Sequence, residues 1–257
     1  ALVRYASALV DADHSADIRL EAALAKLWGT EAGWRAADAA VQIRGGRGYE
    51  TADSLRARGE APEPVERFLR DCRINTIFEG STEIMHLFIA REMLDPHLRR
   101  GADAIDTRKP WGERIPAALR AGAFYAGWYP ARFIPTVAEL PHDLEPALRR
   151  GLKDVAALSR ALSRAVFHAM LRHGPKLERE QLLLARLVDA GAEILAMACA
   201  CGFAQQMKTD ASHPLAGHVV ETADYVCRRG KRRVRALLHA HAHDTDARGY
   251  ALAKRLL

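Results

Sequence analysis

The chain has 257 residues, 49% of them hydrophobic, and its four cysteines show no disulfide-framework spacing. It should fold around a core of its own without disulfide staples, which fits a reducing compartment such as the cytosol. The formal charge of +6 is uneven, because residues 147–257 carry 19 basic and 10 acidic residues. No uncharged run approaches the length of a membrane-spanning helix. Alanine, leucine, arginine and glutamate favour helix almost everywhere, so we expect an all-α protein.

The first hundred residues predict three helices joined by a glycine-rich loop and an acidic turn. Apolar residues recur at helical spacing over residues 17–41, and the three glycines of RGGRGYE end that periodicity. Pro64 suits the first turn of the next predicted helix, VERFLRDCRIN. Ser81 or Thr82 can cap the third helix, TEIMHLFIAREML, which we expect to halt before Pro96.

The rest of the chain predicts a connector and a second small helical bundle. The connector contains many prolines and aromatic residues, and the aromatic residues favour a segment that packs on the protein over a free linker. Helical stretches follow at about 145–173, 176–205 and 214–243. We therefore expect a helical domain at residues 1–96, the connector at residues 97–146 and a basic helical extension at residues 147–257.

Three separated motifs then form an ordered pattern. They are the loop in AAVQIRGGRGYE, the helix VERFLRDCRIN and the turn IFEGST. Their combination closely resembles the last helical domain of flavin-dependent acyl-CoA dehydrogenases, and covers roughly the first 95 residues. The helical segment behind them resembles the C-terminal extension of the very-long-chain branch of this family in position, length and helical character.

The resemblance implies α,β-dehydrogenation of a fatty acyl-CoA to a trans-2-enoyl-CoA. In this reaction a base takes the α-proton while a hydride leaves the β-carbon for FAD. Glu79 occupies the family's base position, just ahead of a predicted helix N-terminus where backbone N–H groups can hold anionic groups. Gly80 matches a glycine that contacts the substrate, where the missing side chain leaves room for the thioester.

The resemblance also implies two groups of FAD contacts. Ser81 and Glu83 match positions that touch the cofactor, although the family most often has Thr at the first and Gln, Asn or Asp at the second. Gln42, Gly45 and Gly46 match the loop that reaches the FAD of a neighbouring subunit. A complete site would then need at least a dimer.

Acyl-CoA dehydrogenases normally carry an N-terminal helical domain and a middle β-domain before this module. We therefore expect the sequence to be the C-terminal portion of a longer enzyme, with its first domain incomplete at Ala1. Alone it would neither hold FAD tightly nor turn over substrate. The family implies electron-transfer flavoprotein or a similar electron acceptor as a partner, and we expect a cytoplasmic protein.

The basic cluster is the main feature that the family site does not use. It consists of Arg228, Arg229, Lys231, Arg232, Arg233 and Arg235. A solvated helix face is the ordinary interpretation. The alternative function is a non-catalytic binding module whose basic C-terminal domain binds an anionic membrane or DNA. We favour the membrane, because aromatic residues are sparse in this segment and no base-reading module is evident.

Other reactive side chains have ordinary explanations. His239, His241 and His243 invite a metal site, but no third ligand is evident and a polar helix end explains them, so we expect no metal. Cys199 and Cys201 are interpreted as small buried side chains and not as a redox pair.

Overall fold

The computed structural model describes residues 1–135, 139–210, 212–213, 215–240 and 245–256. All regular structure in these ranges is helical, which confirms the predicted all-α fold. The elements are α1 (Leu2–Ala12), α2 (Arg19–Arg44), α3 (Gly46–Tyr49), α4 (Ala52–Ala57), α5 (Val65–Ile74), α6 (Thr82–Ile105), α7 (Trp111–Ala131), α8 (Pro146–His173), the 3-10 helix η1 (Gly174–Arg179), α9 (Gln181–Met207), α10 (Val219–Ala240) and α11 (Asp246–Leu256).

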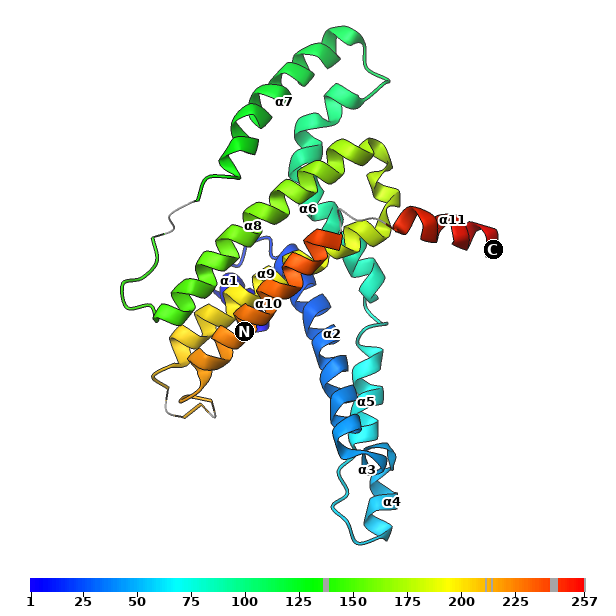
Figure 1. The fold of residues 1–257 in the computed structure, drawn as a ribbon, viewed down its shortest axis with the longest axis vertical. Helices are drawn as coiled ribbons and strands as arrows, with labels where there is room; N and C mark the ends of the chain where they lie inside the picture. The colour runs from blue at the N-terminus through cyan, green and yellow to red at the C-terminus, as the bar shows by residue number, and fades with distance from the viewer. Residues whose placement is uncertain (136–138, 211, 214, 241–244, 257) are drawn as a thin grey trace.

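The helices form a central bundle with two projections (Figure 1). Helices α8, α9 and α10 pack together in the bundle, and α1 and the start of α2 pack against α9. Helix α2 then leaves the bundle beside α5 and reaches a tip made of α3 and α4, which we call the arm. Helices α6 and α7 form a hairpin that projects in the opposite direction.

A shared core joins the first helices of the chain to the bundle. Helix α9 is apolar around most of its circumference, which is typical of a helix buried on all sides. Leu187 of α9 belongs to one cluster with Leu27 of α2, Ile89 of α6 and Val166 of α8. A second cluster joins α9 to α8 and α10. Helices α2 and α6 are therefore held by the same apolar core as the C-terminal bundle.

The predicted end of the third helix is wrong, because α6 continues through Pro96 to Ile105. A proline inside a helix removes one backbone donor and strains one turn. Here α7 packs along the extended part of α6, and His97 stacks on Tyr125 with ring centroids 5.8 Å apart. Tertiary packing on both sides of the proline outweighs its local cost.

Several short elements differ from the sequence-based expectation. Much of the expected connector is helix α7, and its aromatic residues pack on α8, where Tyr125 and Phe167 have ring centroids 4.9 Å apart. The glycine-rich loop forms the short helix α3, and the following loop contains α4. Helix α11 was not expected. These elements are short or interrupted by proline, so periodicity alone does not reveal them.

Candidate active site

A strained turn carries the candidate base. In this turn, residues 76–81, Glu79 has a φ of 51° and Gly80 a φ of 97°. Among the described residues, Glu79 is the sole non-glycine residue with positive φ. Such a backbone costs on the order of 1 kcal/mol or more and is common at functional sites. The Glu79 side chain is exposed to solvent.

Gly80 is favoured by its backbone conformation, because a residue with a side chain would be strained at its positive φ. A Cβ atom there would also lie 2.6 Å from the Cε atom of Met85, but this flexible side chain can move away. The chain therefore places an exposed carboxylate beside a residue with no side chain, as the resemblance implies for a base and the site of a thioester.

Helix α2 holds the turn by polar contacts. The Lys26 ammonium donates to the Phe78 carbonyl at 3.2 Å and also to the Gly80 carbonyl. The Thr82 hydroxyl donates to Glu31 at 2.8 Å, and the Thr82 N–H donates to the Thr76 carbonyl at 3.0 Å. The bonds from α2 hold the second half of the turn and the first residue of α6, and the bond between Thr82 and Thr76 closes the turn on itself.

The turn leads directly into the N-terminus of α6. Ser81 is the N-cap residue, and its hydroxyl oxygen accepts from the Ile84 N–H at 3.4 Å. The backbone N–H of Glu83 and the Ser81 hydroxyl lower the pKa of the Glu83 carboxyl below its ordinary value. An ionised carboxylate is favourable at the positive end of a helix dipole. Ser81, and not Thr82, is thus the cap.

The C-terminal bundle supports α2 and α6 from behind the turn. His86 of α6 lies 2.9 Å from Asp189 of α9. The Trp28 indole of α2 donates to the buried carboxylate of Glu193 at 3.2 Å, and Arg233 of α10 pairs with the same carboxylate at 3.3 Å. Two polar clusters, both centred on carboxylates of α9, therefore connect α2, α6 and α10 beside the elements that carry the turn.

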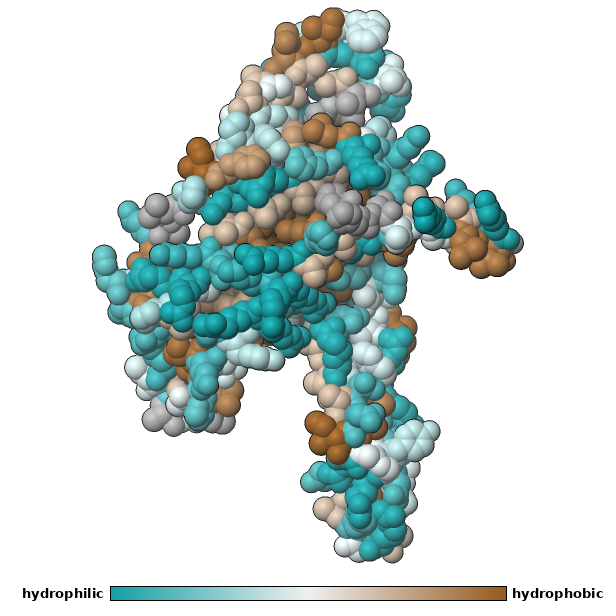
Figure 2. All heavy atoms as spheres, viewed as in Figure 1, coloured by the Kyte–Doolittle hydropathy of each residue, from teal (hydrophilic) through white to brown (hydrophobic). Residues whose placement is uncertain are grey.

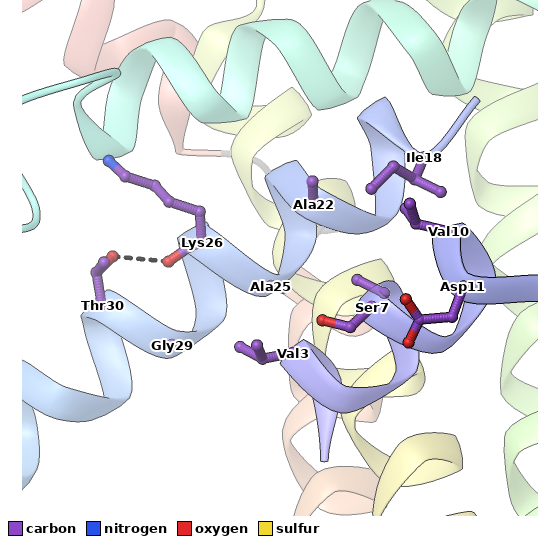
Figure 3. A pocket seen from close by; sticks show the side chains of 11 residues that line it. Val3, Ser7, Val10, Asp11, Ile18, Ala22, Ala25, Lys26, Gly29 and Thr30 are labelled. Atoms are coloured by element: carbon purple, nitrogen blue, oxygen red, sulfur yellow. Dashed lines mark hydrogen bonds between the residues drawn. The ribbon is translucent and has the colours of Figure 1, made fainter. Parts of the chain in front are cut away.

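A groove lies between α1 and α2, next to Lys26. It has a volume of 650 Å³, with mainly apolar walls that include Val3, Val10 and Ile18 (Figure 3). Lys26 of α2 is one of the residues that line the groove, and its side chain extends away from it so that the ammonium reaches the turn (Figure 3). The groove therefore lies beside the residue that holds the turn.

The predicted contacts to the second FAD lie far from the turn. Gln42, Gly45 and Gly46 are exposed where α2 ends, roughly 25–30 Å along the helix axis from Lys26. Gly48 is the glycine that packing requires, because a Cβ there would lie 2.5 Å from the Val41 carbonyl oxygen. The structure therefore brings Glu79, Gly80, Ser81 and Glu83 together and leaves the glycine-rich loop apart.

The basic cluster forms part of a hydrophilic surface along α10 (Figure 2). Three of its six cations form ion pairs, namely Arg228 with Asp224, Lys231 with Asp154, and Arg233 with Glu193. Arg229, Arg232 and Arg235 are exposed. The ion pairs neutralise half of the cluster and tie α10 to α8 and α9.

Membrane-spanning helices and metal-ligand clusters are both missing from the described part of the chain. No helix there is long and apolar enough to cross a bilayer. The same residues contain no group of three or more potential metal ligands. His241 and His243 of the histidine-rich segment lie outside the described residues.

Fold and site together define a helical module that presents one carboxylate from a strained turn at a helix N-terminus. The acyl-CoA dehydrogenase C-terminal domain matches residues 1–94, and the ACAD9/ACADV C-terminal domain matches residues 146–256. The chain belongs to the acyl-CoA dehydrogenase family.

Individual relatives that match most or all of the chain support its membership of this family. Probable acyl-CoA dehydrogenase FadE10 of Mycobacterium tuberculosis is 42% identical over 260 residues, covering 100% of this chain and 39% of the relative. The human mitochondrial very long-chain specific acyl-CoA dehydrogenase is 28% identical over 221 residues, covering 85% of this chain and 32% of the relative. The chain thus spans less than half the length of these relatives.

A solved structure shares the fold. The crystal structure of an acyl-CoA dehydrogenase complexed with FAD from Bacillus anthracis superposes with a TM-score of 0.60 at 19% identity, covering 91% of this chain and 35% of that one.

The side chains that hold the turn do not stand out in the sequence. Lys26 and Glu31 lie on a helix expected from periodicity alone, where a lysine and a glutamate are ordinary surface residues. Their contacts join residues about fifty positions apart in the chain. No local sequence signal identifies such long-range partners.

Proposed function

We propose that this chain is the C-terminal part of an FAD-dependent acyl-CoA dehydrogenase that oxidises a fatty acyl-CoA to a trans-2-enoyl-CoA. Glu79 is the base that removes the α-proton of the thioester. The observation that carries the proposal is the strained backbone of Glu79, which presents an exposed carboxylate beside Gly80 and directly ahead of the α6 N-terminus.

The chemistry requires more than a carboxylate. The α-proton of a thioester is far less acidic than a carboxylic acid, so a site must desolvate the base and stabilise the developing enolate. The N–H groups at the start of α6 and the helix dipole supply partial positive charge beside Glu79. Gly80 leaves room for the thioester, whose carbonyl would accept from the Glu79 backbone N–H.

Two separate places on the chain suit a flavin cofactor. When bound, FAD would accept the hydride that leaves the β-carbon. Ser81 can offer its hydroxyl, and Glu83, being ionised, suits a donor group of the cofactor better than its phosphates. At Gly45 and Gly46 nothing lies within 4 Å of where a Cβ atom would stand, so bare backbone can approach a dinucleotide closely.

The distance between these two places supports an oligomer. Because the glycine-rich loop lies along α2 far from the turn, one copy would offer the turn to its own FAD and the loop to the FAD of its neighbour. We propose a homodimer as the smallest complete unit.

Alone, this chain would neither hold FAD tightly nor turn over substrate. Electron-transfer flavoprotein or a similar acceptor would reoxidise the flavin of this cytoplasmic enzyme.

The test uses a protein of the relatives' full length that contains this chain. It should purify yellow, and a saturated acyl-CoA should bleach the flavin absorbance under anaerobic conditions. Glu79→Gln should retain flavin and lose the bleaching. Glu178→Gln, an exposed glutamate on η1, is the matched control and should bleach normally. Normal bleaching in Glu79→Gln would end the assignment of this residue.

A peripheral membrane contact is a second proposal, supported by α7. Trp111, Ile115 and Leu119 are exposed and spaced four residues apart, so they share one face of the helix. Arg114 stacks over Trp111 at 4.4 Å from the ring centroid. An apolar face with nearby cations is typical of helices that lie on anionic membranes.

Sedimentation with anionic vesicles tests this contact. Trp111→Ser with Leu119→Ser should abolish co-sedimentation. Arg229→Glu with Arg232→Glu on α10 should reduce it less. Equal sedimentation of all forms would show that neither surface binds the membrane. Salt-sensitive binding of duplex DNA would instead favour DNA as the partner of the basic cluster.

A further inference from the structure

Two thiols meet inside the C-terminal bundle. Cys201 of α9 and Cys227 of α10 have their sulfur atoms 3.4 Å apart, and their exposed fractions are 0% and 3%. The Cys227 sulfur also lies 3.8 Å from the Met197 carbonyl oxygen. Both cysteines belong to the apolar cluster that joins α8, α9 and α10. The pair is therefore fixed by packing between helices and does not depend on a surface loop.

Helix α8 passes directly over this pair. A Cβ atom at Gly151 would lie 2.8 Å from the Cys227 sulfur and 2.9 Å from the Cys201 sulfur. Glycine is thus the residue that lets three helices meet around two touching sulfurs. Cys199 lies two residues earlier on α9 but packs in a different cluster, with Leu2 and Ala25.

A small opening leads from the surface to Cys227. A cavity of 250 Å³ is lined by Cys227 and Gly151 and by five charged residues, Arg150, Asp154, Asp224, Arg228 and Lys231. Ion pairs hold its rim, with Lys231 2.7 Å from Asp154 and Arg228 2.6 Å from Asp224. A small neutral molecule can reach the sulfur through such an opening more readily than a bulky reagent.

We propose that Cys201 and Cys227 are a site of reversible oxidation, at which hydrogen peroxide converts the two thiols into a disulfide that joins α9 to α10. The sulfur of Cys227 attacks one peroxide oxygen, the O–O bond breaks, and a sulfenic acid and one water form. The Cys201 sulfur then displaces the sulfenic oxygen, which leaves as a second water. The two thiols lose two electrons and two protons, and one peroxide is reduced to two waters.

The structure favours this order of events. Cys227 lines the cavity, whereas Cys201 lies behind it. The hydrogen bond between the thiols lowers the pKa of Cys227 and raises that of Cys201, so Cys227 is the better nucleophile. Closing the bond requires the sulfurs to approach by about 1.4 Å. The product would close the segment between α9 and α10 and favour the folded state.

Mass spectrometry of the 257-residue chain tests the proposal. The reduced chain is treated with hydrogen peroxide at neutral pH, quenched, denatured, alkylated and digested. A peptide linking Cys201 to Cys227 should appear with the loss of two hydrogens, while Cys199 stays alkylated. Dithiothreitol should restore both thiols. The proposal is overturned if both cysteines remain alkylatable at peroxide concentrations that oxidise the half-buried Cys72, or if other cysteines pair instead.

Variants and denaturant separate a built site from chance pairing. Cys201→Ser should trap a sulfenic acid at Cys227 that reacts with dimedone, and Cys199→Ser should form the disulfide at the wild-type rate. The wild-type chain should form the disulfide faster when folded than in concentrated urea, and faster formation in urea would contradict the proposal. The wild-type comparison decides the question even where a variant fails to fold.

Discussion

The Glu79 turn and the tip of the arm depend on the same helix but are stabilised in different ways. The turn lies where α2 and α6 share an apolar cluster with α8 and α9, and polar bonds from Lys26 and Glu31 fix it. The tip lies at the far end of α2, where Ile43 and Tyr49 are exposed. A single helix thus links a region that is internally supported to one whose apolar residues face outward.

This difference fits the separate roles that we propose for the two regions. A base at Glu79 would have to be held in one orientation, and the contacts of Glu193 and Asp189 fix the helices behind the turn. A loop that contacts the FAD of a neighbouring subunit would need an exposed surface, which the tip of the arm has. Four substitutions test whether the regions are as independent as this comparison requires.

Leu187→Ala should have the largest effect. Leu187 is 1% exposed in the cluster shared by α2, α6, α8 and α9. Its truncation should cost about 2–5 kcal/mol and weaken the turn and the bundle together. Chemical denaturation checks the free energy of unfolding. Leu182→Ala, on the same helix but 48% exposed, is the control and should change stability little. An equally small effect at Leu187 would contradict the shared core.

Gly48→Ala should disturb the tip and spare the turn. The added methyl group would lie 2.5 Å from the Val41 carbonyl oxygen, so α3 must shift at a cost of about 1–3 kcal/mol. Amide hydrogen exchange should increase in residues 41–57 and stay unchanged in residues 76–84. Gly46→Ala is the matched control, because nothing lies within 4 Å of the added Cβ. Faster exchange in the turn would show that the two regions are coupled.

Thr82→Val should loosen the turn and spare the tip. The substitution keeps the side-chain shape but removes the 2.8 Å bond to Glu31, which is worth about 1.5–3 kcal/mol for a charged acceptor. Amide exchange should rise in residues 76–84 alone. If exchange there is unchanged, the bond from α2 does not hold the turn.

Glu83→Gln should have the smallest effect, and it should depend on pH. The pKa of Glu83 is lowered in the folded protein, so its carboxylate stabilises the fold above the ordinary value of 4.5. That contribution is lost as the pH falls through the lowered pKa. Because the side chain is exposed, we expect about 0.5 kcal/mol or less at neutral pH and no difference from wild type in acid. Thermal melts at several pH values measure the difference.

Sequence alone predicted the helical class and the family, because residue composition and three ordered motifs carry that information locally. It also predicted Ser81 as one of two possible caps. It could not predict that α6 passes through Pro96, since the helix is supported there by packing against distant parts of the chain, including α7. The contacts of Lys26, Glu31 and Asp189 were equally hidden, because each partner lies far away in the chain.

The most direct test of Glu79 as the base measures exchange of the α-hydrogen of an acyl-CoA with solvent. A protein of the relatives' full length that contains this chain is incubated with an acyl-CoA deuterated at the α-carbon, and solvent exchange is followed by mass spectrometry without an electron acceptor. The wild type should wash out the deuterium, and Glu79→Gln should retain it while still binding flavin. Wild-type washout in Glu79→Gln would contradict the account, because another group would then be removing the α-proton.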